Sequence, residues 1–89
     1  MECLTDLPNV GESIAADLHR LGIAVPGQLI GQCPYRLYER LCESTGKRHD
    51  LCLLDVFISI TRFMGGDDAR PWWDFTRERK RTLAGQEYR

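Results

Sequence analysis

The segment from Asn9 to Ser13 lies between two stretches of helical periodicity and has the residue types needed to bind an oxyanion. A turn that leads into a helix leaves backbone N–H groups unpaired, and the helix dipole adds partial positive charge there. A phosphate oxygen fits such a place, and Gly11 removes the Cβ that would keep the oxygen away. The sequence therefore predicts a phosphate site made of the backbone amides of Asn9, Val10, Gly11, Glu12 and Ser13.

Two features of the same segment support a purely structural interpretation. A turn of the form Leu7-Pro8-x-x-Gly11 also joins helices where no ligand binds. Asp6 and Glu12 place negative charge beside the predicted site, and like charge repels a phosphate. Glu12 in a first helical turn also stabilises the helix itself.

The basic residues are concentrated in the second half of the chain. The 89 residues carry a net charge of −1, which argues against a protein that binds nucleic acid with its whole surface. Residues 1–46 hold six acids and three bases, whereas residues 47–89 hold nine bases and seven acids. We expect the basic contacts to a phosphate backbone to come from Lys47, Arg48, Arg77, Arg79, Lys80 and Arg81, the alternative being ordinary solvated charge.

The cysteines and histidines do not have the spacing of a metal site. Cys42, His49 and Cys52, with Cys3 or Cys33 as a fourth ligand, are the best candidates, but six and two intervening residues match no zinc pattern. His19 and His49 are the only imidazoles, and so short a chain has little room for a cleft. We predict no metal, no cofactor, no small-molecule substrate and no enzymatic activity.

Trp72 and Trp73 admit two interpretations. Adjacent indoles are able to stack on the bases of single-stranded nucleic acid. They more commonly close a small hydrophobic core, and this is the interpretation that we favour.

The elements that position these residues are short helices. Apolar residues recur at spacings of three and four, and Pro and Gly cut the chain into short pieces. We expect helices over residues 2–7, 11–22, 26–30, 34–45 and 50–64. The fold class is therefore all-α, a compact bundle of about five short helices. We expect one domain over residues 1–75 and a basic, mobile tail over residues 76–89.

The helix expected over residues 50–64 is apolar on most of its circumference. Asp55, Ser59 and Arg62 form one thin polar stripe at spacings of four and three. Such a helix lies either at the centre of the bundle or in an interface. The second possibility predicts a protein partner or a homodimer that uses this helix, without a role for nucleic acid.

No apolar run approaches the length of a membrane span, and the first residues lack the charge and apolar core of a signal peptide. We therefore expect a cytoplasmic protein without membrane contact.

Several stretches together carry a family resemblance. They are residues 11–18, the Leu21-Gly22-Ile23 stop, residues 37–42, the Thr45-Gly46-Lys47 turn, Asp50 with Cys52, Val56-Phe57 and Trp72-Trp73. This pattern, from about residue 4 to residue 75, resembles the small bacterial pathogenicity-locus, or mitomycin-resistance-like, family of helix-hairpin-helix proteins. Its first part is similar to the C-terminal domain of the competence-regulator family. The resemblance implies a SAM-like helical fold with one helix-hairpin-helix and weak, non-specific DNA binding.

Overall fold

The computed structural model describes residues 3–85, and all of its regular structure in that range is helical. The predicted all-α class is therefore confirmed. The described residues form four α-helices and three short 3₁₀ helices, in the order η1 (Leu4–Asp6), α1 (Glu12–Arg20), η2 (Pro26–Leu29), α2 (Pro34–Thr45), α3 (Leu51–Met64), η3 (Trp72–Phe75) and α4 (Thr76–Gly85).

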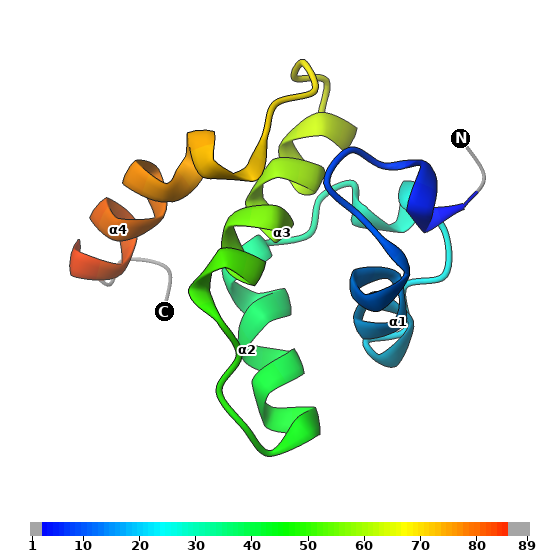
Figure 1. Ribbon diagram of the computed structural model, residues 1–89, viewed down its shortest axis with the longest axis horizontal. Coiled ribbons are helices and arrows are strands. Elements are labelled where there is room, and N and C mark those ends of the chain that lie inside the picture. The colour runs from blue at the N-terminus through cyan, green and yellow to red at the C-terminus, as the bar shows by residue number, and fades with distance from the viewer. Residues whose placement is uncertain (1–2, 86–89) are drawn as a thin grey trace.

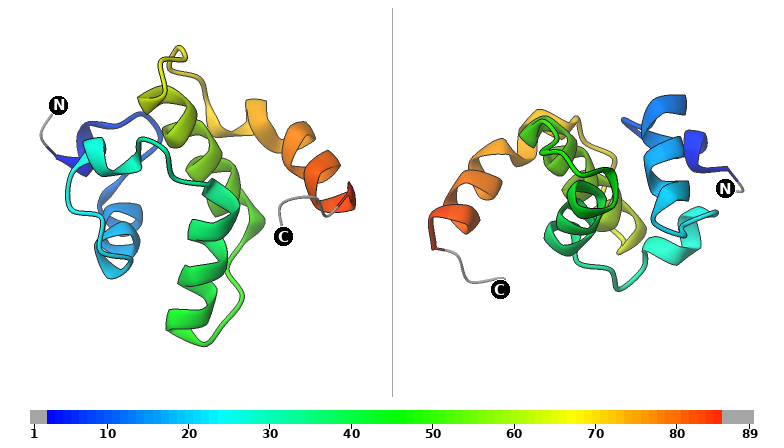
Figure 2. Two further views of the ribbon diagram at one scale, coloured as in Figure 1. Left: turned by 180° about the vertical axis from the view of Figure 1, so that it is seen from behind. Right: turned by 90° about the horizontal axis from the view of Figure 1, so that it is seen from below.

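Helices α2 and α3 form the middle of the molecule (Figure 1). The chain reverses between them in a loop that runs back beside α2, so that α3 packs against part of α2 and extends beyond it. Helix α1, with η1 and η2, lies on one side of this pair, and η3 with α4 lies on the other, as both views in Figure 2 show. The first and last described elements, η1 and α4, are therefore separated by the α2–α3 pair.

Helix α3 is the central element of the core. Every residue from Leu54 to Ile60 is buried, including Asp55 and Ser59. Contacts with α2, η2, η3 and α4 surround the helix within this one chain. Its apolar circumference is thus explained by burial inside the bundle, which is the first of the two alternatives stated above. No helix within residues 3–85 is long and apolar enough to cross a membrane.

Glycine ends α1 in the manner predicted from the sequence. Gly22 has φ +86°, a left-handed conformation that a residue with a side chain rarely adopts. Its N–H donates to the carbonyl of His19 at 2.9 Å, and the N–H of Ile23 donates to the carbonyl of Leu18 at 3.0 Å. These two bonds form a Schellman motif, and the buried side chains of Leu18 and Ile23 close it. The C-terminal end of α1 is thereby fixed against the core.

The aromatic cluster before α4 is only partly in the core, which corrects the expectation for the tryptophans. Phe75 is fully buried and Trp72 is half-buried against the core, but Trp73 keeps 62% of its surface exposed. The indoles of Trp72 and Trp73 meet edge to face, with their centroids 5.5 Å apart. The expected core role therefore holds for Trp72 and is wrong for Trp73.

Residues Thr76–Gly85 form a regular helix that packs on α3 and η3. The sequence predicted that this stretch has little to bury, because its apolar content is low. The structure instead buries Arg79, a charged residue, against α3. The remaining tail residues, 86–89, lie outside the described part of the chain.

Candidate functional site

The turn between η1 and α1 is tight and held from beneath by apolar side chains. Leu7 and Val10 are buried on either side of it, and the N–H of Val10 donates to the carbonyl of Leu7 at 3.3 Å. Asn9 at its tip has φ +69°, the one positive φ among the non-glycine residues described. Asparagine tolerates this left-handed conformation better than most residues do, so it closes the turn without a glycine.

The side chain of Asn9 fastens the turn to the rest of the molecule. Its Nδ2 donates to the carbonyl oxygen of Arg70 at 2.7 Å and to Oγ of Ser59 at 3.2 Å. Ser59 is buried in α3, and Arg70 belongs to the segment that leads from α3 to η3. The turn is therefore fixed at its tip as well as through its apolar residues.

The start of α1 presents backbone amides to solvent. Gly11 is the extended N-cap residue and supplies no side-chain cap. The first helical hydrogen bond is the one from the N–H of Ala15 to the carbonyl of Gly11, at 3.0 Å. The N–H groups of Glu12, Ser13 and Ile14 therefore have no intrahelical acceptor. Gly11, Glu12 and Ser13 are exposed, and a Cβ added to Gly11 would meet nothing within 4 Å.

Two carboxylates accompany this amide cluster, as the sequence indicated. Glu12 is exposed in the first turn of α1. Asp6 has its Oδ2 3.1 Å from the N–H of Cys3, which donates to it across η1. The Asp6 carboxylate is thereby engaged at the start of η1, whereas Glu12 adds negative charge to the same helix end that carries the free amides.

The polar stripe of α3 binds side chains from the first turn and from α4. Ser59 accepts from Asn9, Asp55 accepts from α4, and Arg62 forms an ion pair with Glu78 of α4. Asp55 and Ser59 are one helical turn apart, so the predicted phosphate site and α4 are anchored to adjacent positions on the same helix. The sequence located this stripe but gave no partners for it.

The contact between Asp55 and α4 is a buried, multidentate ion pair. Nε of Arg79 donates to Oδ1 of Asp55 at 2.8 Å, and Nη2 donates to Oδ2 at 3.2 Å. Oγ1 of Thr76 donates to the same Oδ2 at 2.6 Å. Asp55 is fully buried and Arg79 keeps 7% of its surface exposed. The hydrogen bonds that Arg79 donates to Asp55 hold the pKa of Arg79 above its ordinary value, although burial alone would lower it.

This ion pair divides the basic residues of α4 into two groups and removes Arg79 from the expected surface contacts. Its guanidinium is directed into the protein, toward Asp55. Arg77, Lys80 and Arg81 are exposed and, at spacings of three and four, share the side of α4 opposite Arg79. None of these three has a carboxylate partner among residues 3–85.

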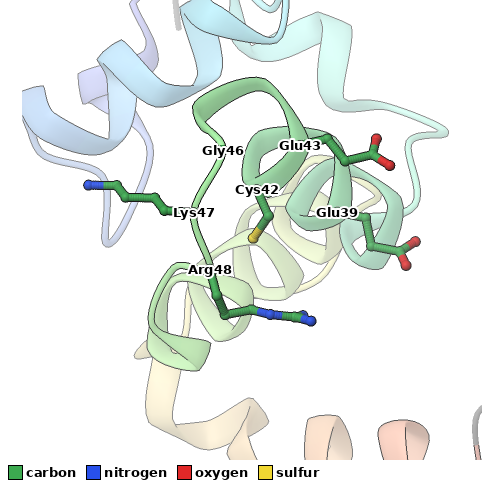
Figure 3. Close-up of a pocket in the computed structure, with 6 residues that line it drawn as sticks. All are labelled: Glu39, Cys42, Glu43, Gly46, Lys47 and Arg48. Carbon is green, nitrogen blue, oxygen red and sulfur yellow. The ribbon is translucent and has the colours of Figure 1, made fainter.

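Lys47 and Arg48 lie in the loop between α2 and α3, at the rim of a shallow hollow of about 360 Å³. Figure 3 shows the two side chains leaving the loop in opposite directions, while Glu39 and Glu43 project from α2 on the side toward which Arg48 points, away from the sulfur of Cys42. The hollow therefore mixes both signs of charge. It lies at the end of α3 opposite the attachment of Asn9, so it does not adjoin the amide cluster.

His49 is used in local packing. Its Nε2 is 2.9 Å from Oγ1 of Thr45, and its backbone carbonyl accepts a hydrogen bond from the hydroxyl of Tyr38. Burial raises the pKa of Tyr38, with a further contribution from Cys42. Within residues 3–85, no three side chains of the metal-binding types gather closely enough to hold an ion.

The predicted contacts thus fall in separate places. The amides of residues 11–13 lie on the α1 side, and the exposed bases of α4 lie across the α2–α3 pair (Figure 2). Lys47 and Arg48 occupy a third position at the end of the pair. The sequence located Asp55 and Ser59 in the polar stripe but not their partners, although polar residues within an apolar helix are a signal that each needs one. The role of the Arg70 carbonyl, which lies outside the helices, was missed.

The fold and this arrangement define a small all-helical protein with an open helix start held on a rigid turn. The chain belongs to the pathogenicity-locus family, which matches residues 1–81. It is 48% identical over 83 residues to the mitomycin resistance protein McrB of Streptomyces lavendulae, a match that covers 93% of this chain and 79% of that protein. No solved structure matches the chain at a significant level.

Proposed function

We propose that this protein is a cytoplasmic, non-catalytic module that binds DNA without sequence preference, through the backbone amides at Gly11, Glu12 and Ser13. Val10, which the sequence predicted as part of this site, does not contribute, because its N–H donates to the carbonyl of Leu7. The observation that carries the proposal is the run of exposed amides at the start of α1, which finds no acceptor in the described chain. Such amides and the helix dipole both favour a phosphate oxygen. Because the donors are backbone groups, they contact phosphates and leave the bases unread.

The anchoring of Asn9 supports this function energetically. Its two hydrogen bonds, to Arg70 and Ser59, fix the turn before any ligand arrives. A site that is already ordered pays less conformational entropy when it binds. Gly11 also favours binding, because the open space around its Cα lets a phosphate approach the amides closely.

The test compares two glycines that accept a side chain equally well. Neither Gly11 nor Gly27 has a positive φ, and a Cβ at either would meet nothing within 4 Å. We expect Gly11→Asp to weaken binding to a fluorescent duplex by about tenfold or more at low salt, because the new carboxylate occupies the anion site. Gly27→Asp, with the same change of charge, should bind as the unaltered protein does. Equal affinities of the two variants would overturn the proposal.

Glu12 provides a test in the opposite direction. Its carboxylate lies in the first turn of α1 and repels the proposed ligand. We expect Glu12→Gln to tighten duplex binding by about two- to fivefold at low salt, and the gain should shrink as salt is added. An unchanged affinity would place the phosphate elsewhere on the molecule.

The relative from Streptomyces lavendulae connects this chemistry to a phenotype. That protein is a mitomycin resistance protein, and we propose that the present chain acts in the same kind of resistance by binding DNA. Cells that express this chain should survive mitomycin better than cells that express Gly11→Asp at the same level. Equal survival would mean that any resistance does not depend on the amide site.

A further inference from the structure

We propose that the outer side of η3 and α4 is a second nucleic-acid surface, which binds single strands by stacking a base on Trp73 and holding phosphates with Arg77, Lys80 and Arg81. It is separate from the amide cluster of residues 11–13 and does not depend on it. The two lie on opposite sides of the α2–α3 pair (Figures 1 and 2).

Burial defines which side of this segment faces outward. Phe75 and Arg79 lie four residues apart and are both buried against α3. Trp73, by contrast, keeps 62% of its surface exposed, and Arg77, Lys80 and Arg81 are exposed as well. The outward side of η3–α4 therefore combines one large aromatic ring with three cations.

The indole of Trp73 is held as a platform. The ring of Trp72 meets it edge to face at 84°, and Trp72 itself packs against the core. The segment before it is fixed in turn, because the carbonyl of Arg70 accepts from Asn9 and the Arg70 guanidinium lies over the ring of Phe75, 4.7 Å from its centroid. A ring with a fixed backbone and a fixed neighbour loses little freedom when a base stacks on it.

The charge of this surface is positive because its acids are already neutralised. Asp74 pairs with Arg70 at 3.3 Å, and Glu78 pairs with Arg62 of α3. Neither acid is therefore free to compensate the cations of α4. Arg77, Lys80 and Arg81 have no carboxylate within 4.0 Å in the described chain. They are left to attract an anionic partner.

An exposed ring beside unpaired cations selects a single strand over a duplex. Base-aromatic stacking needs an accessible base face, and a duplex hides these faces in its stack. The distance along η3 and α4 from Trp73 to Arg81 is about 13 Å, at about 2.0 Å per residue through η3 and 1.5 Å per residue through α4. That length corresponds to about three to four nucleotides of a stacked strand. Short oligomers are therefore sufficient ligands, and DNA and RNA share the chemistry.

The first experiment titrates the full chain with thymidylate and uridylate oligomers of about ten nucleotides and follows tryptophan fluorescence and anisotropy. We expect binding at low salt, with Trp73→Ala weakening it by roughly 5- to 150-fold. Ile30→Ala is the matched control, because Ile30 is 61% exposed at a site on η2. An equal effect of the two substitutions, or no binding of either oligomer, would overturn the proposal.

The second experiment tests the cations through the salt dependence. Arg77→Gln with Arg81→Gln should flatten the plot of log affinity against log salt by about 1.4, at roughly 0.7 per phosphate contact on a single strand. The control pair Arg20→Gln with Arg36→Gln makes the same change of net charge on α1 and α2. If both pairs change the slope equally, the change of net charge alone explains the effect, and the proposed role of Arg77 and Arg81 is overturned.

The amide cluster is tested in the same titration. Gly11→Asp should leave single-strand affinity unchanged while it weakens duplex binding, and Trp73→Ala should do the reverse. Failure of the first proposal therefore appears only with the duplex, and failure of the second only with single strands. A Trp73→Ala variant that loses both ligands equally would contradict the separation of the two surfaces. Circular dichroism checks that each variant is folded.

Discussion

The side-chain amide of Asn9 donates to the hydroxyl of Ser59 at 3.2 Å, across 50 residues of sequence. This bond joins the tip of the first turn to the buried stripe of the central helix. One turn earlier on α3, Asp55 receives Arg79 in the same way. The core helix thus determines the position of both proposed ligand-binding surfaces.

The Asn9 tether predicts a graded loss of stability. Asn9→Ala removes two hydrogen bonds and places alanine, which tolerates the left-handed conformation less well than asparagine, at φ +69°. We therefore expect it to lower the free energy of unfolding by about 2–4 kcal/mol. Asn9→Gly removes the same bonds but tolerates the conformation, and should lose about 1–2 kcal/mol. Urea denaturation measures both. Equal losses would mean that the backbone conformation contributes nothing.

The Asp55–Arg79 pair predicts a strong dependence of stability on each partner. Arg79→Met leaves a buried carboxylate uncompensated and should cost about 3–5 kcal/mol in the free energy of unfolding. Adding Asp55→Leu should restore most of that loss, because two apolar side chains replace two charges. Chemical denaturation of the two variants checks this. A double variant no more stable than Arg79→Met would contradict it.

Burial of two tyrosines predicts weakening of the fold in alkali. Desolvation raises the pKa of both Tyr35 and Tyr38 above the ordinary value of 10.0. The folded state therefore holds these protons longer than the unfolded state does. This contribution to stability is complete below pH 10 and is lost as the pH rises through the folded-state pKa values. Denaturation curves should agree between pH 8 and 9 and shift to lower urea above pH 10, and Tyr35→Phe should reduce the shift.

Gly11→Asp predicts opposite effects on stability and on binding. Aspartate is a better N-cap than glycine, and its negative charge interacts favourably with the positive end of the α1 dipole. We expect the melting temperature to rise, corresponding to about 0.3–1 kcal/mol, while duplex affinity falls. Thermal denaturation checks the first part. A lower melting temperature would mean that the loss of binding reports damage to the fold.

Local patterns predicted α2 and α3 closely. Pro34 at the first turn and Gly46 after the last one gave α2 its bounds, and the apolar run gave α3 to within one residue. The stripe of Asp55, Ser59 and Arg62 was visible for the same reason, since helical spacing is a local property. The amide donors were also predictable, because any helix start leaves them unpaired.

What the sequence alone determined was therefore the helices up to Met64, their apolar faces and the unpaired amides at the start of α1, whereas it predicted a mobile tail where α4 forms. Tertiary structure decided that Asn9 reaches Ser59, that Arg79 turns inward to Asp55 and that Trp73 stays outside. Helical periodicity depends on neighbours three or four residues away. The partner of a buried polar group lies 24 or 50 residues distant here, so only the packing of the helices brings the two together.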